Sequence, residues 1–290
     1  MFPEIIDPRA LRGAIDGFVD RLVTNYADAL DAFSRPILQL LVWLENLLRA
    51  TPWWLLILAV MGIAWLVSRR VLLSAGMGLL LFAIGALGLW DAGMQTLSLM
   101  IMATALSVLV GIPLGIAMAR ASWLRTVMLP VLDVMQTMPS FVYLIPVVML
   151  FGLGKIPAII ATVIYAVPPL IRLTDLGIRL VDREVLEASR AFGATPRQQL
   201  FGVQLPLALP NIMAGINQTT MMALAMVVVA SMIGARGLGE DVLAGIQTLD
   251  VGRGLQAGVA IVILAIVIDR ITQAYGQPRR RRTQPLQEQP

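Results

Sequence analysis

Residues that commonly carry out catalysis are scarce in this chain. Its 290 residues include no histidine and no cysteine, so the usual proton shuttle and the usual thiol nucleophile are both absent from the sequence. Gly154-Lys155 does not belong to a phosphate-binding loop, because Ile156 follows it and Met149 occupies the position of the first loop glycine. We therefore expect no enzyme activity, no metal site and no nucleotide site in this chain.

Polar side chains within two long apolar stretches are better candidates for function. Such groups are costly in a membrane unless they face a cavity or a partner, so they mark candidate routes for a solute. The pathway candidates are Asp133, Met135, Gln136, Thr137, Asn217, Gln218 and Met221. Asp133 could attract a cation such as choline, although pairing with Arg125 is the interpretation we favour. The methionines have a plainer explanation, because this residue type fills irregular gaps in any packed helix bundle.

The segment 176–206 carries the clearest local signals in the chain. Asp182 is a suitable N-cap for a short amphipathic helix over 183–192, and Gly193 suits the left-handed position that follows its last turn. Thr195, with the proline and glutamine that come after it, has the pattern of a capping box and predicts a second helix. The segment is therefore predicted to be a folded helix–turn–helix elbow, which can transmit force because a packed unit moves as a whole.

One tract of this elbow resembles a family signature. Its residues are Glu187, Ala188, Ser189, Gly193, Leu205 and Pro206. Their types and spacing are similar to the EAA signature of permeases from binding-protein-dependent ABC importers, with Ser189 where a second alanine is usual. The resemblance implies that this tract is a coupling helix, which in the family docks into a groove on the ATP-binding subunit.

The resemblance extends from about residue 95 to 275. The segments 136–146, 237–243 and 264–273 look like those of the glycine betaine/proline betaine/choline permease subfamily. This implies a type I ABC importer permease fold and transport of choline, glycine betaine or proline betaine. It also implies a homodimer of permeases, an external substrate-binding protein, and two ATPase subunits that bind ATP and magnesium in place of this chain.

The composition indicates which elements would position these residues. Hydrophobic residues make up 58% of the chain, charged residues only 14%, and the mean hydropathy is +0.81. Such a surface is stable where lipid replaces water, and each crossing needs about 20 mostly apolar residues. We therefore expect an all-α polytopic membrane protein with about seven spans. These are predicted near 53–67, 71–90, 95–119, 127–151, 156–174, 208–233 and 256–275.

The positions of the arginines predict the orientation. Arginines gather in alternate loops, near 69–70, 120–125, 179–197 and 279–282. Since Lys and Arg are enriched in cytoplasmic loops, we expect an external N-terminus and a cytoplasmic C-terminus in the bacterial plasma membrane. The net charge of +4 thus reflects membrane flanks, and we expect no nucleic-acid partner.

Four regions follow from these assignments. They are an external tail at 1–50 with an interfacial helix at 36–48, a transmembrane hairpin at 51–94, a permease core at 95–275, and a disordered cytoplasmic tail at 276–290. In the core, small residues recur every four positions and mark one helix face, which we expect to pack within the bundle rather than to form a dimer contact. They are Ala103, Ser107, Gly111, Gly115 and Ala119. Asp269 and Arg270 are expected to pair with each other or with a neighbouring helix.

Two other functions remain open. A permease of the same superfamily could carry a different small solute, such as methionine, another amino acid or an oxyanion. A secondary transporter is the less favoured alternative, because it would be expected to show repeated halves and the sequence has no convincing internal repeat.

Overall fold

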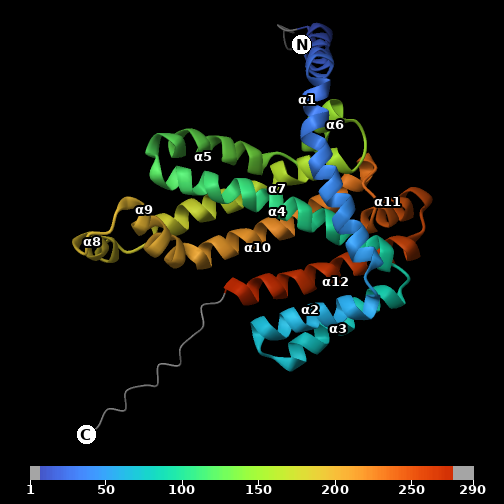
Figure 1. Cartoon of the computed structure of the whole chain (residues 1–290). Coiled ribbons are helices and arrows are strands. Elements are labelled where there is room, and N and C mark those ends of the chain that lie inside the picture. The colour runs from blue at the N-terminus through green and yellow to red at the C-terminus, as the bar shows by residue number, and fades with distance from the viewer. Residues whose placement is uncertain (1–6, 277–290) are drawn as a thin grey trace, which may run out of the picture.

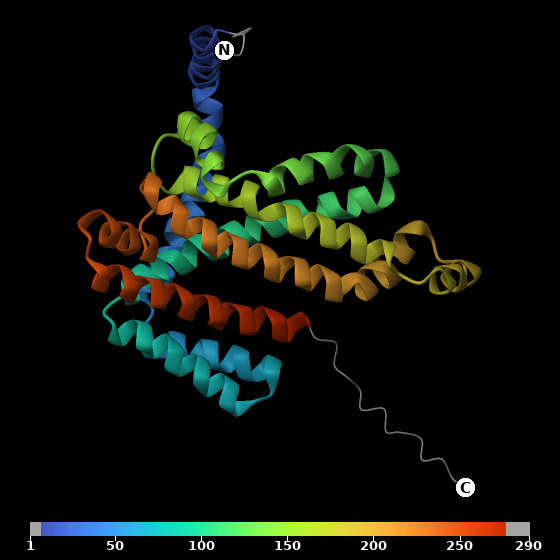
Figure 2. The ribbon, with the colours of Figure 1, turned by 180° about the vertical axis from the view of Figure 1, so that it is seen from behind.

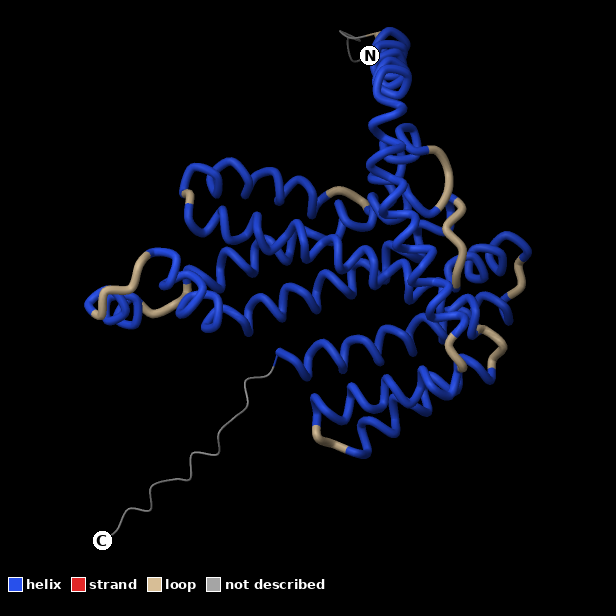
Figure 3. Tube along the Cα trace, in the orientation of Figure 1, coloured by secondary structure: helices blue, strands red, loops and turns tan. Residues whose placement is uncertain are grey.

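The computed structural model describes residues 7–276, and the regular elements in that range are all helical (Figure 3). The helices are α1 (Pro8–Ala50), α2 (Trp53–Ser68), α3 (Val71–Ala86), α4 (Trp90–Arg120), α5 (Ser122–Thr137), η1 (Ser140–Tyr143), α6 (Leu144–Phe151), α7 (Lys155–Arg179), α8 (Arg183–Ala191), α9 (Pro196–Gln199), η2 (Leu200–Gln204), α10 (Leu205–Ala230), η3 (Ser231–Ile233), α11 (Leu238–Thr248) and α12 (Val251–Gly276). The predicted tail at 276–290 lies outside the described residues, apart from its first residue.

Length and composition identify four to six candidate membrane spans, which is fewer than the seven expected. Four helices qualify alone: Trp90–Arg120, Lys155–Arg179, Pro196–Ile233 and Val251–Gln273. Two bent pairs qualify together: Asp16–Ala50 with Trp53–Ser68, and Ser122–Thr137 with Ser140–Phe151. The apolar helix α3 has 16 residues and is therefore only about 24 Å long at 1.5 Å per residue.

The prediction of one continuous span at 127–151 is wrong. α5 ends at Thr137, and the chain then turns by 111° into η1 and α6. Met138 has extended backbone angles, which is the conformation that a following proline favours, and Pro139 has no N–H to continue a helix. The apolar sequence runs across this point, but the backbone does not.

Apart from α1, the long helices lie side by side and roughly parallel or antiparallel (Figure 1). Seen from both sides, α5 and the α2–α3 hairpin lie at opposite edges, with α7, α10 and α12 between them (Figures 1 and 2). The turns after α2 and α4, the α8–α9 elbow and the last residues of α12 all lie at one end of these helices (Figure 1). Three of the four arginine-rich loops of the sequence, near 69–70, 120–125 and 179–197, therefore lie at this end, as the predicted orientation requires, and the fourth, at 279–282, is outside the described residues. Which compartment this end faces stays a prediction.

The close contact between α4 and α7 depends on the row of small residues. A Cβ added to Gly115 would lie 2.5 Å from Thr174 Cβ, and one added to Gly111 would lie 2.9 Å from a methyl carbon of Leu170. No side chain fits at those distances, so the backbones of α4 and α7 approach closely only because both positions are glycine. The prediction that this face packs within the bundle is confirmed.

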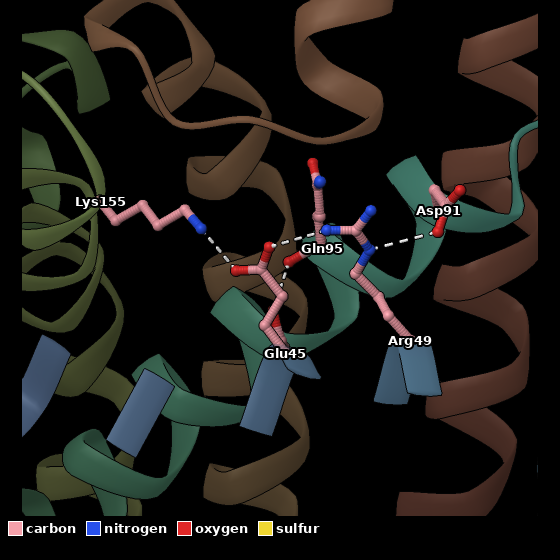
Figure 4. Close-up of polar contacts among 6 residues, drawn as sticks. Glu45, Arg49, Asp91, Gln95 and Lys155 are labelled. Atoms are coloured by element: carbon pink, nitrogen blue, oxygen red, sulfur yellow. Dashed lines mark hydrogen bonds and ion pairs between the residues drawn. The ribbon is translucent and has the colours of Figure 1, made fainter. Parts of the chain in front are cut away.

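Helix α1 crosses the other helices instead of running with them, and it turns by 104° into α2 (Figure 1). The helix predicted at 36–48 is thus part of a longer helix that begins at Pro8. Its second half is anchored by Glu45, a buried carboxylate that Lys155 Nζ contacts at 2.6 Å (Figure 4). Arg49 extends the network, with Nε 3.2 Å from Asp91 on α4 (Figure 4). These ion pairs connect α1 to the first turns of α4 and α7. The position of α1 relative to the membrane surface stays a prediction.

Candidate coupling elbow and translocation pathway

The elbow consists of α8 and α9, and its ends are formed as the sequence indicates. The Asp182 carboxylate accepts a hydrogen bond from the Glu184 N–H at 2.9 Å and caps α8. Gly193 follows α8 with φ of +80°, a left-handed conformation that favours glycine. Thr195 caps α9 in a reciprocal capping box with Gln198. The local predictions for 183–199 are therefore confirmed.

One buried side chain holds the two elbow helices together. Gln199 Nε2 donates to the backbone oxygen of Leu186 at 2.8 Å, and Gln199 itself is buried. Because this bond joins α8 to α9, the elbow is a single packed unit. Beyond it, η2 is a π-helical turn, in which the Leu205 N–H bonds to the Leu200 oxygen. The chain is therefore helical from α9 into α10 without a break, so α10 extends the elbow into the bundle.

Two apolar side chains are exposed on the elbow among charged ones such as Glu187. Phe192 is 93% exposed and Val185 is 41% exposed, although both belong to the apolar face expected for this amphipathic helix. Of the predicted coupling residues, Glu187, Ala188, Gly193 and Pro206 are exposed, and Ser189 and Leu205 are partly buried. Phe192, beside the left-handed Gly193, is thus a candidate contact for a partner.

A buried carboxylate fastens the base of the elbow to two other helices. Asp175 on α7 accepts from Arg179 Nε at 2.7 Å and from Arg125 Nε, on α5, at 3.0 Å. Arg179 Nη2 also donates to the backbone oxygen of Met118 on α4 at 2.9 Å. These charge-assisted bonds tie the end of α7, where the elbow begins, to the α4–α5 turn.

A second contact reaches the elbow from the last residue of α4. Arg120 Nη2 donates to the backbone oxygen of Pro196 on α9 at 2.7 Å. The elbow therefore connects covalently to α7 and α10 and non-covalently to α4. A movement of the elbow would be transmitted to all three helices at once.

The prediction that Asp133 pairs with Arg125 is wrong. Asp133 Oδ1 lies 2.5 Å from Arg172 Nη2 on α7, and Arg125 pairs with Asp175 instead. Asp133, Gln136 and Thr137 are all exposed and follow one another at the helical spacing of a single face, just before α5 breaks. Met135 is partly buried. The structure thus brings the α5 candidates together on one surface.

The α10 candidates do not form one group. Asn217 Nδ2 donates to Asp269 Oδ1 at 3.1 Å, and the Thr272 hydroxyl donates to Asn217 Oδ1, so Asn217 holds α10 to α12. The expectation that Asp269 contacts a neighbouring helix is confirmed. Gln218 is exposed and Met221 partly buried, and neither makes a polar contact with the α5 group among the described residues.

Arg172 and Asp175 were not predicted as site residues, although their charges within an apolar helix are visible in the sequence. A charged residue in a mostly apolar helix is unfavourable unless it is paired or functional. Two such residues three positions apart lie on one face of α7. Pairing them with Asp133 and Arg125 required knowing that α5 packs against α7, which no local pattern reveals.

The chain is similar to several known proteins. It matches the family described as "Binding-protein-dependent transport system inner membrane component" over residues 111–282. It is 48% identical to the glycine betaine/proline betaine transport system permease protein ProW of Escherichia coli, across 91% of this chain and 74% of that protein. It is 44% identical to the glycine betaine transport system permease protein OpuAB of Bacillus subtilis, across 91% of this chain and 93% of that protein.

The fold is similar to that of a solved transporter. The MetNI methionine ABC transporter, in an inward-facing conformation, matches 64% of this chain and 95% of its own, with a TM-score of 0.56 and 25% identity. This likeness and the relatives confirm the type I ABC importer permease fold that the tract at 187–206 indicated. The chain therefore belongs to the family of binding-protein-dependent transport system inner membrane components.

Proposed function

We propose that this chain is the membrane-spanning permease subunit of an ATP-driven importer for quaternary ammonium compounds. The solute class is choline, glycine betaine or proline betaine, and the names of the two relatives support glycine betaine and, for one of them, proline betaine. The chain is not itself an enzyme, and ATP hydrolysis takes place on a partner subunit.

The observation that carries this proposal is the elbow. Its two helices are joined by the Gln199–Leu186 bond, and its apolar side chains Phe192 and Val185 are exposed in the isolated chain. A docked ATPase would cover this surface, and Glu187 beside it could meet a basic group of that partner. The bonds from Arg120 and Asp175 support the transmission of ATPase movement into α4, α5 and α7.

The proposed assembly contains two permease copies, two ATPase subunits and an external substrate-binding protein. It lies in the bacterial plasma membrane with the N-terminus outside and the C-terminus in the cytoplasm. The grouping of the arginine-bearing turns at the elbow end supports this orientation, because the ATPases bind ATP in the cytoplasm.

The translocation pathway is proposed to follow the surface of α5 that precedes its break, with Asp133, Gln136 and Thr137. Irregular backbone at membrane depth is tolerated where it is buried in protein or lines a water-filled cavity, which supports a passage near Met138. Gln218 and Met221 on α10 are further candidates. For Asn217, its bonds to α12 favour a packing role.

Purification from native membranes in mild detergent tests the proposal directly. We expect an ATPase with a phosphate-binding loop to copurify in near-equimolar amount. The reconstituted complex should then import labelled glycine betaine or choline when the binding protein and ATP are supplied. A stable permease that repeatedly purifies alone would contradict the proposed coupling role of the elbow.

Methionine is a second candidate solute, favoured by the fold of the MetNI methionine transporter. Identity to that structure is 25%, however, against 48% to the betaine permease of Escherichia coli. Labelled methionine in the same uptake assay separates the two, since a betaine permease should not import it.

A further inference from the structure

An accessible ion pair lies on the surface of α5 that we propose for the pathway. Arg172 Nη2 contacts Asp133 Oδ1 at 2.5 Å, and the Asp133 side chain is 65% exposed. Arg172 Nε is buried and has no hydrogen-bond partner among the described residues. The guanidinium thus keeps an unused donor beside the pair, and an unpaired buried donor is unfavourable unless something else fills the role.

A second ion pair between the same two helices shows what a purely structural pair looks like here. Arg125 and Asp175 also join α5 to α7, with the charges reversed between the helices. The Asp175 side chain is 5% exposed and its carboxylate accepts from two arginines. The Asp175 carboxylate is therefore buried, and both of its oxygens accept hydrogen bonds. In the Asp133–Arg172 pair, by contrast, the carboxylate is exposed and one guanidinium N–H has no partner among the described residues.

We propose that Asp133 and Arg172 together form a binding site for the two ends of a zwitterion. The proposal rests on the proposed function and narrows its solute class to betaines. A betaine carries a carboxylate and a quaternary ammonium group. Its carboxylate would take the place of the Asp133 carboxylate on Arg172 Nη2, while its ammonium group would lie beside Asp133. Asp133 and Arg172 would then each pair with the opposite charge of the betaine instead of with each other, so neither side chain would be left without a partner.

The same geometry disfavours a simple cation. Choline could replace Arg172 as the partner of Asp133, but its hydroxyl brings no negative charge for the guanidinium. Arg172 would then remain unpaired in a partly buried position, 30% exposed, which is unfavourable. Arg172 is therefore the residue that selects zwitterions over cations, whereas Asp133 would attract both.

Saturation-transfer NMR on the permease–ATPase complex in nanodiscs, without binding protein, tests this proposal. The probes are glycine betaine and choline, followed through their methyl signals. We expect Arg172→Gln to weaken glycine betaine binding at least tenfold, about 1.4 kcal/mol, and to leave choline binding unchanged or stronger. Arg270→Gln, on α12 and away from the pair, should alter neither.

A double variant distinguishes a pair that binds solute from one that only holds α5 to α7. Asp133→Asn with Arg172→Gln keeps two groups that can hydrogen-bond to each other, so a pair that only fastens α5 to α7 would be largely restored. We expect this variant to melt near the wild-type temperature and still to lose glycine betaine binding. Restored glycine betaine binding would overturn the proposal, and so would wild-type binding by Arg172→Gln.

The outcome can be distinguished from failure of the proposed function. If the wild-type complex imports glycine betaine and Arg172→Gln binds and imports it equally well, the function stands and the zwitterion site is refuted. If the wild-type complex neither imports nor binds a quaternary ammonium compound, the proposed solute class and the zwitterion site fall together.

Discussion

Removal of the Asp175 carboxylate should loosen the base of the elbow. In Asp175→Asn, Arg179 and Arg125 lose the carboxylate that lies 2.7 and 3.0 Å from them. Removing one partner of a buried ion pair destabilises a protein by about 3–5 kcal/mol. The two arginines are 35% and 42% exposed, so water would solvate them in part, and we expect a loss of about 2–3 kcal/mol.

Thermal unfolding of the purified permease–ATPase complex measures this loss. At about 2–4 °C per kcal/mol for a chain of this size, the melting temperature should fall by about 4–12 °C. A matched control is Asp31→Asn, whose partner Arg35 lies 3.7 Å away and whose side chain is 69% exposed. Exposed pairs contribute little, so the control should melt as the wild type does.

The functional readout is the number of solute molecules imported per ATP hydrolysed. Under conditions where Asp175→Asn remains folded, the ratio should fall, because the elbow no longer moves with the α4–α5 turn. An unchanged melting temperature would refute the energetic reasoning. A stability loss with an unchanged ratio would show that the cluster is structural only.

Three further substitutions have defined expectations. Gly115→Ala should lose about 1–3 kcal/mol in thermal unfolding, since the new methyl lies 2.5 Å from an α7 side chain, whereas Gly76→Ala meets nothing within 4 Å and should be neutral or stabilising. Gly193→Val should reduce solute-stimulated ATP hydrolysis because φ of +80° strains a β-branched residue, and Gly193→Asn should be milder. Arg120→Ala should lower the import-to-ATP ratio without a change in melting temperature, and the control Arg70→Ala should leave the ratio unchanged.

Each expectation has a contrary result. Equal melting temperatures for Gly115→Ala and Gly76→Ala would mean that α4 and α7 can separate at no cost. Normal stimulation of ATP hydrolysis in Gly193→Val would show that coupling does not depend on the left-handed turn at Gly193. A full import-to-ATP ratio in Arg120→Ala would mean that α7 and α10 alone transmit the movement.

Local structure was predictable wherever a few adjacent residues determine it. The elbow is the clearest case, since Asp182, Gly193 and Thr195 each satisfy or end a helix through bonds to residues at most a few positions away. Such signals do not depend on the rest of the fold. The small-residue face of α4 was predictable for a related reason, because glycine at that spacing permits close approach to any neighbouring helix.

The partner of Asp133 could not be predicted in the same way. Arg125 is two helical turns away on the same helix, whereas Arg172 lies 39 positions along the chain on α7. Only the packing of α5 on α7 selects between them. Pro139 was a signal in the sequence for the break after Thr137. The apolar residues on both sides of the break, however, resemble those of one continuous span.

The π-helical turn at Leu200–Gln204 sets the rotational phase between the elbow and the bundle. The bond from the Leu205 N–H to the Leu200 oxygen encloses one residue more than an α-helical turn does. Each residue of an α-helix turns the chain by about 100°, and the bond from the Leu205 N–H places Leu205 where the fourth residue after Leu200 would lie in an α-helix. If this wide turn relaxed into a regular α-helix with no residue removed, the elbow would rotate by about that angle. The π-helical turn therefore fixes the direction in which Phe192 is presented.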